Sequence, residues 1–181
     1  MNNSTILNLS ESELIKACIN KESLAEKALY DKYKSRLFAI CLRYLKNKEE
    51  AEDIFTNGFI QIFSNLKSYS GKGSFEGWMK KIMVNECLME IRKSSDSKNF
   101  IEIEDFPLSA PETIFSELGV QEILKLIHEL PVQQRTVFNL YVFEDYSHEE
   151  IAKEMGISIG GSKSQLSRAR KKLQDLIISH G

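Results

Sequence analysis

Apolar residues recur at steps of three and four along the first half of the chain, which is the spacing of one face of an α-helix. From about residue 11 onward, Leu29, Tyr33 and Leu37 belong to one such stripe. A second stripe begins after the polar residues 47–50. No alternation of apolar and polar positions is long enough to predict a strand, so this half of the chain is expected to be helical.

A loop and a third helix complete the first half. Residues 68–74 contain two glycines and three serines, which is the composition of a loop. Ser74 can cap the helix that begins near Phe75. Because apolar positions continue with helical spacing, this helix is expected to run to about Lys93.

Helical spacing returns near residue 113 and is interrupted by recognisable helix ends. Pro131 suits the first turn of a helix, where its missing N–H costs nothing. Residues 147–150 have the S-x-x-E pattern of a capping box. Gly156 can end the short helix that follows, and Ser158 can cap a last helix that runs to about Ile178.

The residues between the two helical halves differ in composition. Residues 94–120 carry one basic and six acidic side chains, a net charge of −5, and include Pro107 and Pro111. Their one strand-like stretch, IEIEDF, lies beside these prolines and is better explained as extended linker. The sequence therefore predicts an all-α protein with two small helical domains, residues 1–93 and 121–181, joined by a flexible acidic linker.

Composition limits the class of protein further. The 181 residues have a net charge of −2, and the three cysteines are far apart without a C-x-x-C pair. This pattern argues against a disulfide framework or a zinc ribbon and favours a reducing compartment. No apolar run could span a membrane, and the first residues lack the pattern of a signal peptide. We therefore expect a cytoplasmic protein without membrane insertion.

Charge is distributed unevenly along the chain. Residues 1–93 have a net charge of +3, whereas residues 121–155 carry three basic and seven acidic side chains. Residues 156–181 carry five basic side chains and one acidic side chain, a net charge of +4. The alternation indicates that different segments meet different partners.

Residues 147–172 have the pattern of a helix-turn-helix: a capped short helix, a turn at residues 156–158 and a basic second helix. Arg and Gln can bond guanine and adenine, and Ser and Lys suit phosphates. The alternative is an ordinary solvated amphipathic helix, but the cap, the turn and the separation of charge together favour DNA. The candidate DNA-contacting residues are Lys163, Ser164, Gln165, Ser167, Arg168, Arg170 and Lys171.

A second cluster, within residues 73–93, places aromatic rings near lysines, as single-stranded nucleic-acid binding requires. The alternative is that Phe75 and Trp78 are core residues and that Asn85 is a hydrogen-bonded core amide. Composition alone favours this alternative.

The sequence gives little support for an enzyme. The three histidines are scattered, and no nucleotide-binding or nucleophile motif occurs. Glu52 and Asp53 form a lone carboxylate pair, which is more often part of a solvated face than of a catalytic site. We expect no catalytic residue, no metal site and no cofactor.

Three segments, in this order, resemble the bacterial RNA polymerase sigma factors of the sigma-70 family, in the extracytoplasmic-function (ECF) group. They are EAEDIFTNGFIQIFSNL, GSFEGWMKKIMVNECLMEIRK and LPVQQRTVFNLYVFEDYSHEEIAKEMGISIGGSKSQLSRARKKL. The resemblance covers about residues 20–178 and implies sigma region 2 in the first domain and sigma region 4 in the second. It also implies a dissociable, non-catalytic subunit that directs RNA polymerase to promoters and is a monomer when free. The implied partners are core RNA polymerase, through the β′ clamp helices and the β flap, promoter DNA and an anti-sigma factor.

The resemblance also assigns roles to individual residues in the first domain. Residues 51–63 would dock on the β′ clamp helices, and residues 70–93 would melt the −10 element, with the loop before Phe75 holding a flipped base. The family commonly has Gln-Glu where this chain has Thr56 and Asn57. The implied polymerase-binding residues are Glu52, Asp53, Thr56, Asn57, Phe59 and Phe63. The implied −10 residues are Ser74, Phe75, Trp78, Lys80, Lys81, Asn85 and Arg92.

In the second domain, residues 158–172 resemble the helix that contacts the −35 element, and the candidate DNA-contacting residues hold the matching positions. Ile159 and Gly161 stand where Glu and Thr are common, and Gly161 is expected to weaken the start of the helix by roughly 1 kcal/mol relative to Ala. The acidic linker would thread through the polymerase channel that RNA later occupies, or else be a plain solvated linker.

A stand-alone helix-turn-helix regulator, with a sensor or dimerisation domain in its N-terminal half, is the alternative from another class. Such a regulator would protect DNA without polymerase, which distinguishes it from a sigma factor.

Overall fold

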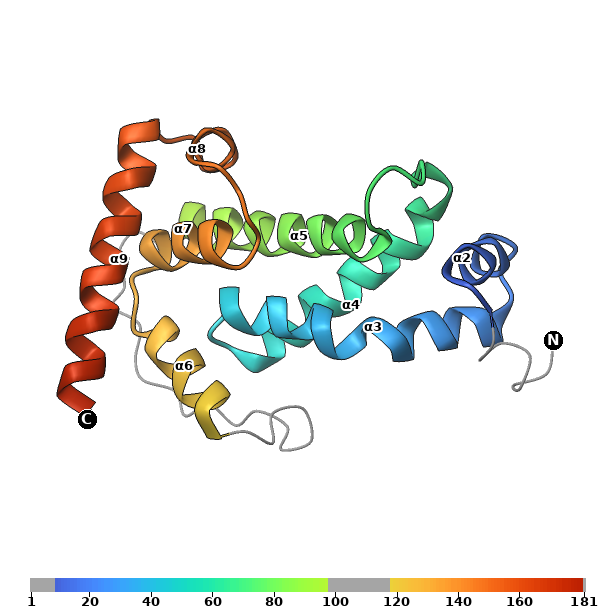
Figure 1. Ribbon diagram of the computed structural model, residues 1–181, viewed down its shortest axis with the longest axis horizontal. Coiled ribbons are helices and arrows are strands. Elements are labelled where there is room, and N and C mark those ends of the chain that lie inside the picture. Colours follow the sequence, from blue (N-terminus) through green and yellow to red (C-terminus); the bar gives the residue numbers. More distant parts are fainter. Residues whose placement is uncertain (1–8, 98–117, 181) are drawn as a thin grey trace. The chain divides into compact units, whose positions relative to one another are not determined.

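In the computed structural model, which describes residues 9–97 and 118–180, every regular element is a helix (Figure 1). The expectation of an all-α protein is therefore confirmed. The chain divides into two compact units, Met1–Pro107 and Leu108–Gly181. Within the described ranges, no helix is long and apolar enough to cross a membrane.

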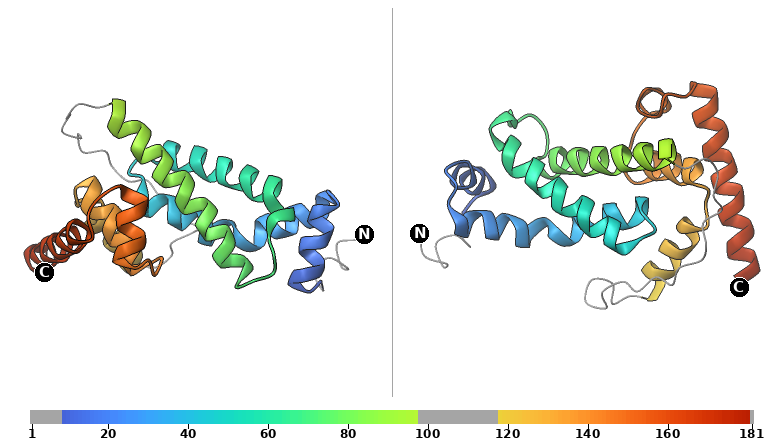
Figure 2. Two further views of the ribbon diagram at one scale, coloured as in Figure 1. Left: turned by 90° about the horizontal axis from the view of Figure 1, so that it is seen from above. Right: turned by 180° about the vertical axis from the view of Figure 1, so that it is seen from behind.

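In the described part of the first unit, three long helices form a bundle with a short helix at one end. Helices α3, α4 and α5 pack on one another, and α2 packs on α3 (Figure 2). A 3-10 helix, η1, follows α4 directly. The bounds are α2 Glu11–Ile19, α3 Ser23–Tyr44, α4 Lys48–Asn65, η1 Leu66–Ser68 and α5 Phe75–Ser97.

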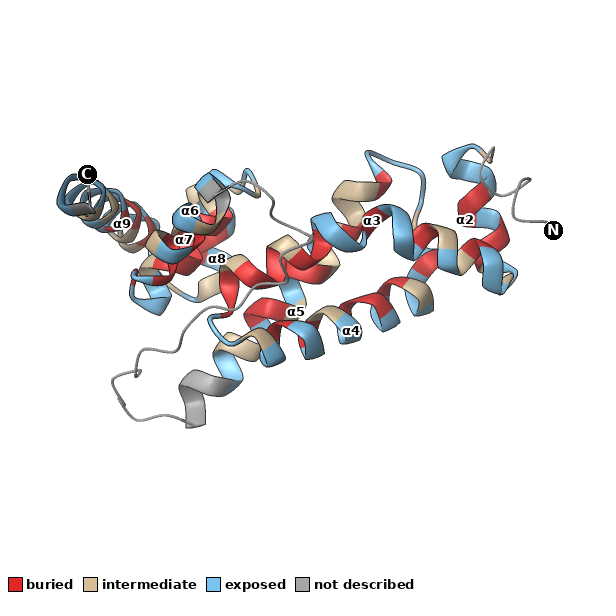
Figure 3. Cartoon of the chain, turned by 90° about the horizontal axis from the view of Figure 1, so that it is seen from below, coloured by how far each residue is buried: buried red, intermediate tan, exposed pale blue. Residues whose placement is uncertain are grey.

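The core of this unit lies between the three long helices, which turn their buried residues toward one another (Figure 3). Leu37, Ile62 and Met79 are fully buried there, one from each long helix. Helices α4 and α5 approach closely at Gly58, where an added Cβ would lie 2.5 Å from the sulfur of Met83. Gly58 is therefore required by the packing of α4 on α5.

Short-range hydrogen bonds define where these helices begin. The Asn47 side chain accepts the backbone N–H groups of Glu49 and Glu50 at the start of α4. Ser74 Oγ accepts the N–H of Gly77 at 2.8 Å, so the expected cap of α5 is confirmed. Helix α5 then continues to Ser97, four residues beyond the expected end near Lys93.

The described part of the second unit has four helices, in which α7 and α8 both pack on the long α9. Its core includes Ile127, Leu130, Val137, Leu140 and Ile151. Pro131 occupies the N-cap position just before α7, one place earlier than expected. The bounds are α6 Leu118–His128, α7 Val132–Val142, α8 His148–Met155 and α9 Ile159–His180.

The turn between α8 and α9 has the expected geometry. Ser147 and Glu150 form both hydrogen bonds of the capping box at the start of α8. Gly156 ends that helix with a left-handed backbone, φ +65°, which favours glycine because it has no Cβ. Ser158 Oγ accepts the N–H of Gly161 at 2.9 Å and so caps α9. The helix-turn-helix arrangement is therefore present.

Most of the expected linker, residues 94–120, lies outside the described residues. Helix α5 extends into its first residues and α6 begins within its last ones.

Candidate nucleic-acid interfaces

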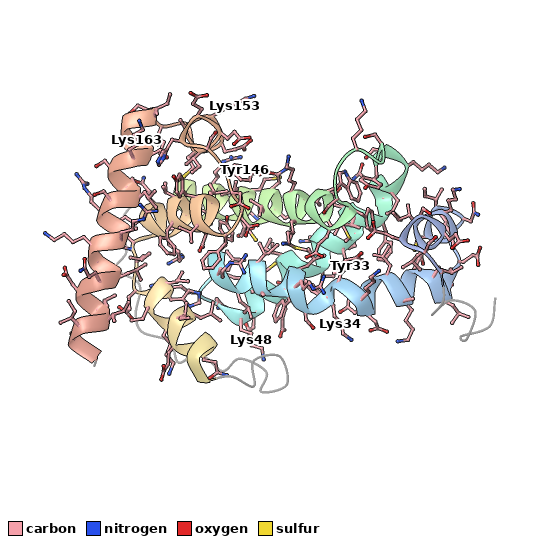
Figure 4. All side chains as sticks on the ribbon, in the orientation of Figure 1. Tyr33, Lys34, Lys48, Tyr146, Lys153 and Lys163 are labelled. Atoms are coloured by element: carbon pink, nitrogen blue, oxygen red, sulfur yellow. The ribbon has the colours of Figure 1, made fainter. Side chains whose placement is uncertain are left out.

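The outward face of α9 carries most of the candidate DNA-contacting residues. Leu166 and Ala169 are buried and fix which side of the helix faces the core. Lys163 extends from the early part of the helix (Figure 4). The exposed members of the predicted set are Lys163, Ser164, Ser167, Arg168, Arg170 and Lys171. The face is therefore basic and hydroxyl-rich, as contact with the DNA backbone and base edges requires.

Two members of the set also contact α7. The half-buried Gln165 donates a hydrogen bond to Gln133 Oε1 at 3.3 Å. The guanidinium of Arg170 lies 5.6 Å from the centre of the Tyr141 ring, a cation–π contact. These contacts place Gln165 and Arg170 at the edges of the outward face, with Ser164, Ser167 and Lys171 between them.

Side chains beneath this face connect the three helices that form it. The Tyr141 ring of α7 stacks on the His148 ring of α8, with 4.7 Å between centres. His148 Nδ1 and the buried Ser162 Oγ of α9 are 2.8 Å apart and share a hydrogen bond. Buried Arg135 donates to the Leu130 carbonyl at 3.2 Å, and burial lowers the pKa of its guanidinium to about 10, so it stays charged at neutral pH. Contacts among α7, α8 and α9 thus hold the outward face of α9 in place.

The second interface is the outward face of α5. Trp78, Lys81, Asn85, Met89 and Arg92 follow one another at steps of three or four residues. Trp78 is half-buried and the other four are exposed. The side chain of Asn85 is exposed and makes no hydrogen bond to the described residues, so the interpretation of Asn85 as a core amide is wrong.

The two aromatic residues at the start of α5 have different environments. Phe75 is 1% exposed, so its ring belongs to the core, as the alternative interpretation held. Its ring stacks on the half-buried Trp78, with 5.6 Å between centres and 18° between planes. Phe75 therefore offers no surface to a base and supports Trp78, which does face solvent in part.

The loop before α5 has a defined conformation. Residues 70–74 are exposed, and Gly71 and Gly73 have left-handed φ angles of +74° and +79°. The Tyr69 hydroxyl donates to the Gly73 carbonyl at 2.8 Å across the loop. Tyr69 was not among the predicted residues, because nothing in its sequence neighbourhood indicates this hydrogen bond.

Lys80 and Lys81, the two lysines of the predicted −10 set, do not share one environment. Lys81 lies on the face of Asn85, whereas Lys80 lies 3.5 Å from Glu76, which also pairs with Arg36 of α3 at 2.7 Å. Lys80 is therefore partly neutralised within the protein. Ser74, the remaining member of the −10 set, is exposed and serves as the cap of α5.

The predicted polymerase-binding residues of α4 fall into two groups. Glu52, Asp53, Thr56 and Asn57 are exposed, and the Thr56 hydroxyl donates to the Glu52 carbonyl at 2.8 Å. Phe59 is buried and Phe63 half-buried, in an aromatic row that also includes Phe55 and Tyr30. The polar group forms an outward face, and the aromatic group holds α4 on the bundle.

Comparison with known families decides the class of protein. Residues 29–96 match the model for sigma-70 region 2, and residues 120–173 match the model for sigma-70 region 4. Together the two matches cover more than half of the chain. The chain is a sigma-70 family sigma factor of the ECF group.

The sigma factor is similar to several curated relatives. It is 28% identical to the ECF sigma factor SigW of Bacillus subtilis over 169 residues, covering 82% of this chain and 88% of SigW. It is also 28% identical to SigE of Mycolicibacterium smegmatis over 159 residues, covering 84% of this chain but only 61% of SigE. The RNA polymerase sigma-H factor of Pseudomonas aeruginosa is 25% identical over 184 residues, covering 92% of this chain and 95% of the relative.

Solved structures share the fold of the sigma factor. The sigma factor RpoE from Bartonella quintana, in complex with the anti-sigma factor NepR, matches with a TM-score of 0.59 and 24% identity, over 83% of this chain and 95% of RpoE. CnrH, in complex with the cytosolic domain of CnrY, matches with a TM-score of 0.53 and 16% identity, over 93% of this chain and 97% of CnrH. At these identities the likeness shows the fold alone.

Proposed function

We propose that this sigma factor binds core RNA polymerase and directs promoter-specific initiation. In this proposal α9 contacts duplex DNA at the −35 element, while α5 and the loop before it hold the unpaired strand of the −10 element. The observation that carries the proposal is the outward face of α5. It combines a half-buried ring, a lysine and an unpartnered amide, Asn85, and a stand-alone helix-turn-helix regulator has no need of such a face.

Single-stranded DNA suits the α5 face because its bases are unpaired. Trp78 presents part of an aromatic surface on which a base can stack. Lys81 supplies a cation for the phosphate backbone. Asn85 carries both a donor and an acceptor for a base edge. Because duplex DNA hides its pairing edges, this set is useful only after the strands separate.

Duplex DNA suits the outward face of α9 because a helix fits the major groove. Arg168 can form two hydrogen bonds to a guanine, and Lys163, Ser164 and Lys171 can contact phosphates. The left-handed Gly156 at the end of α8 and the cap of Ser158 at the start of α9 shape the turn that joins the two helices. The proposal therefore gives duplex recognition to one unit and single-strand recognition to the other.

Docking on polymerase is proposed for the polar outward face of α4, chiefly Glu52 and Asp53, against the β′ clamp helices. The second unit would meet the β flap, and the protein would act in the cytoplasm with the polymerase. An anti-sigma factor is proposed as a further partner, because RpoE was solved with the anti-sigma factor NepR and CnrH with the cytosolic domain of CnrY.

In vitro transcription from genomic fragments tests the function. Purified core polymerase with this protein is expected to yield transcripts from a small subset of fragments, whereas core alone yields none of these. Asp53→Lys is expected to weaken core binding, because it reverses a charge on the proposed docking face. Glu122→Lys, the matched control, makes a charge reversal on the exposed surface of α6 and is expected to leave core binding unchanged.

The outcome that contradicts the proposal is equally specific. If no fragment is transcribed while the protein alone protects a DNA site, the stand-alone regulator is the correct class. If transcription is normal but Asp53→Lys binds core like the wild type, the docking face is not the one proposed.

A further inference from the structure

The loop between η1 and α5 is closed by one side-chain hydrogen bond. The Tyr69 hydroxyl donates to the Gly73 carbonyl at 2.8 Å, and both groups lie at the surface. Immediately after it, Ser74 Oγ accepts the N–H of Gly77 and fixes the start of α5. Two consecutive short-range hydrogen bonds therefore determine the path of residues 69–77.

The backbone inside the closed loop has few other restraints. Gly71 and Gly73 are left-handed, and an added Cβ at either position would meet no atom within 4 Å. The N–H groups of residues 70–73 donate to no group of the described chain. Because glycines sample many conformations, these donors keep fixed directions only while Tyr69 holds Gly73.

The ring of Tyr69 connects this loop to the core. Its centre lies 5.0 Å from that of Phe75 and 5.6 Å from that of Trp78. Phe75 in turn packs edge-on against Tyr33, whose hydroxyl donates to Glu11 of α2 at 2.8 Å. The hydroxyl of Tyr69 is thus carried on a ring whose position is set by the buried Phe75 and the half-buried Trp78.

We propose that Tyr69 is a positioning residue for base selection in the −10 element. By fixing the backbone of residues 70–73 beside Trp78, its hydroxyl presents one arrangement of backbone donors and acceptors to one unpaired base. A fixed set of polar groups rejects bases that leave these groups unpaired, whereas a loosened loop adapts to several bases. This inference rests on the proposed function of α5 and its loop in holding the unpaired strand.

The variant Tyr69→Phe tests the inference, because it keeps both ring contacts and removes only the hydroxyl. Holoenzyme is titrated with a set of single-stranded −10 oligonucleotides. Within the set, one position at a time is varied through each of the four bases. At one position, the ratio of affinities between the best and the worst base is expected to fall by about two- to twelvefold, the effect of losing one hydrogen bond. The ratios at the other positions are expected to stay as in the wild type.

Tyr30→Phe is the matched control. The hydroxyl of Tyr30, on α3, makes no hydrogen bond to the described residues, so every ratio is expected to remain unchanged. Gly73→Ala is a second route to the same loop, because alanine resists the left-handed backbone without touching Tyr69. It is expected to reduce selectivity at the same position as Tyr69→Phe.

The possible results distinguish a failure of the role proposed for Tyr69 from a failure of the function proposed for α5. If the wild type prefers certain bases and Tyr69→Phe has the same ratios throughout, Tyr69 has no role in selection and the inference is wrong. If Tyr69→Phe also lowers the melting temperature of the protein, its loss of selectivity is explained by a general loss of stability. The positioning role is then wrong as well. If the wild-type holoenzyme shows no base preference on single strands, the proposed function of α5 fails, and the inference fails with it.

Discussion

In the sequence, Asn85 lies among Trp78, Ile82 and Met89, which follow one another at helical spacing and form an apolar stripe. A polar residue in such a stripe can be either a core amide or a DNA contact. Helix α5 carries a second apolar stripe, which includes Met79, Met83 and Cys87, and this second stripe is the one that is buried. Met89, from the stripe of Asn85, is 58% exposed. Spacing alone could not choose between the two stripes, because only the packing of α3 and α4 decides which side of α5 faces the core.

The exposure of Asn85 makes a clear prediction for Asn85→Ala. Because no buried contact is lost, and alanine favours helix, the melting temperature is expected to stay the same or rise slightly. Affinity of the holoenzyme for duplex promoter DNA is expected to be nearly unchanged, whereas promoter opening is impaired. Thermal unfolding, duplex binding and opening rates check the three parts. A variant that opens promoters normally would show that Asn85 contacts no unpaired base.

Arg168 and Lys171 are expected to contribute to DNA binding in different ways. Arg168→Ala should cost about 1–3 kcal/mol at one −35 base pair and relax the preference there. Lys171→Ala should weaken binding to all sequences about equally and reduce the salt dependence, because a phosphate contact releases counterions. Competition binding on −35 variants at several salt concentrations checks both. The assignments are wrong if Lys171→Ala changes the base preference and Arg168→Ala does not.

At the scale of the helix, the ends predicted from the sequence are those set by neighbouring residues. The caps by Ser74, Ser147 and Ser158, and the left-handed Gly156, each depend on residues within a few positions of the chain. The turn after α2 was not predicted. It is made by Lys21 at φ +59°, and lysine carries no preference for that conformation.

The contact between α4 and α5 gives a prediction for Gly58→Ala. The new Cβ would lie 2.5 Å from the sulfur of Met83, which is fully buried. We expect a loss of about 1–3 kcal/mol in the free energy of unfolding, the usual cost of overpacking a core. Denaturant unfolding of the two proteins measures this loss.

A double-mutant cycle supplies the control for this contact. In a Met83→Ala background the clashing side chain is absent, so Gly58→Ala is expected to cost much less than in the wild type. Equal costs in both backgrounds would mean that the close approach of α4 and α5 has no energetic effect.

At the scale of the whole molecule, the charge pattern and the ordered motifs were enough to predict two helical units and their class. Contacts between distant residues were not predictable in this way. The Arg36–Glu76 ion pair joins positions 40 residues apart in sequence, and Glu76 also pairs with Lys80. Helical spacing alone separates Lys80 from the face of Asn85, but the pairing of Glu76 with Arg36 depends on the packing of α3 on α5.

The central claim is that this chain opens promoters with polymerase, and does not act on DNA alone. Permanganate footprinting of a promoter fragment measures this directly, because the reagent modifies unpaired thymines. The account predicts reactive thymines in the −10 region when core polymerase and the protein are both present, and none with either component alone. A site protected by the protein alone, with no thymine becoming reactive when core polymerase is added, would contradict the account.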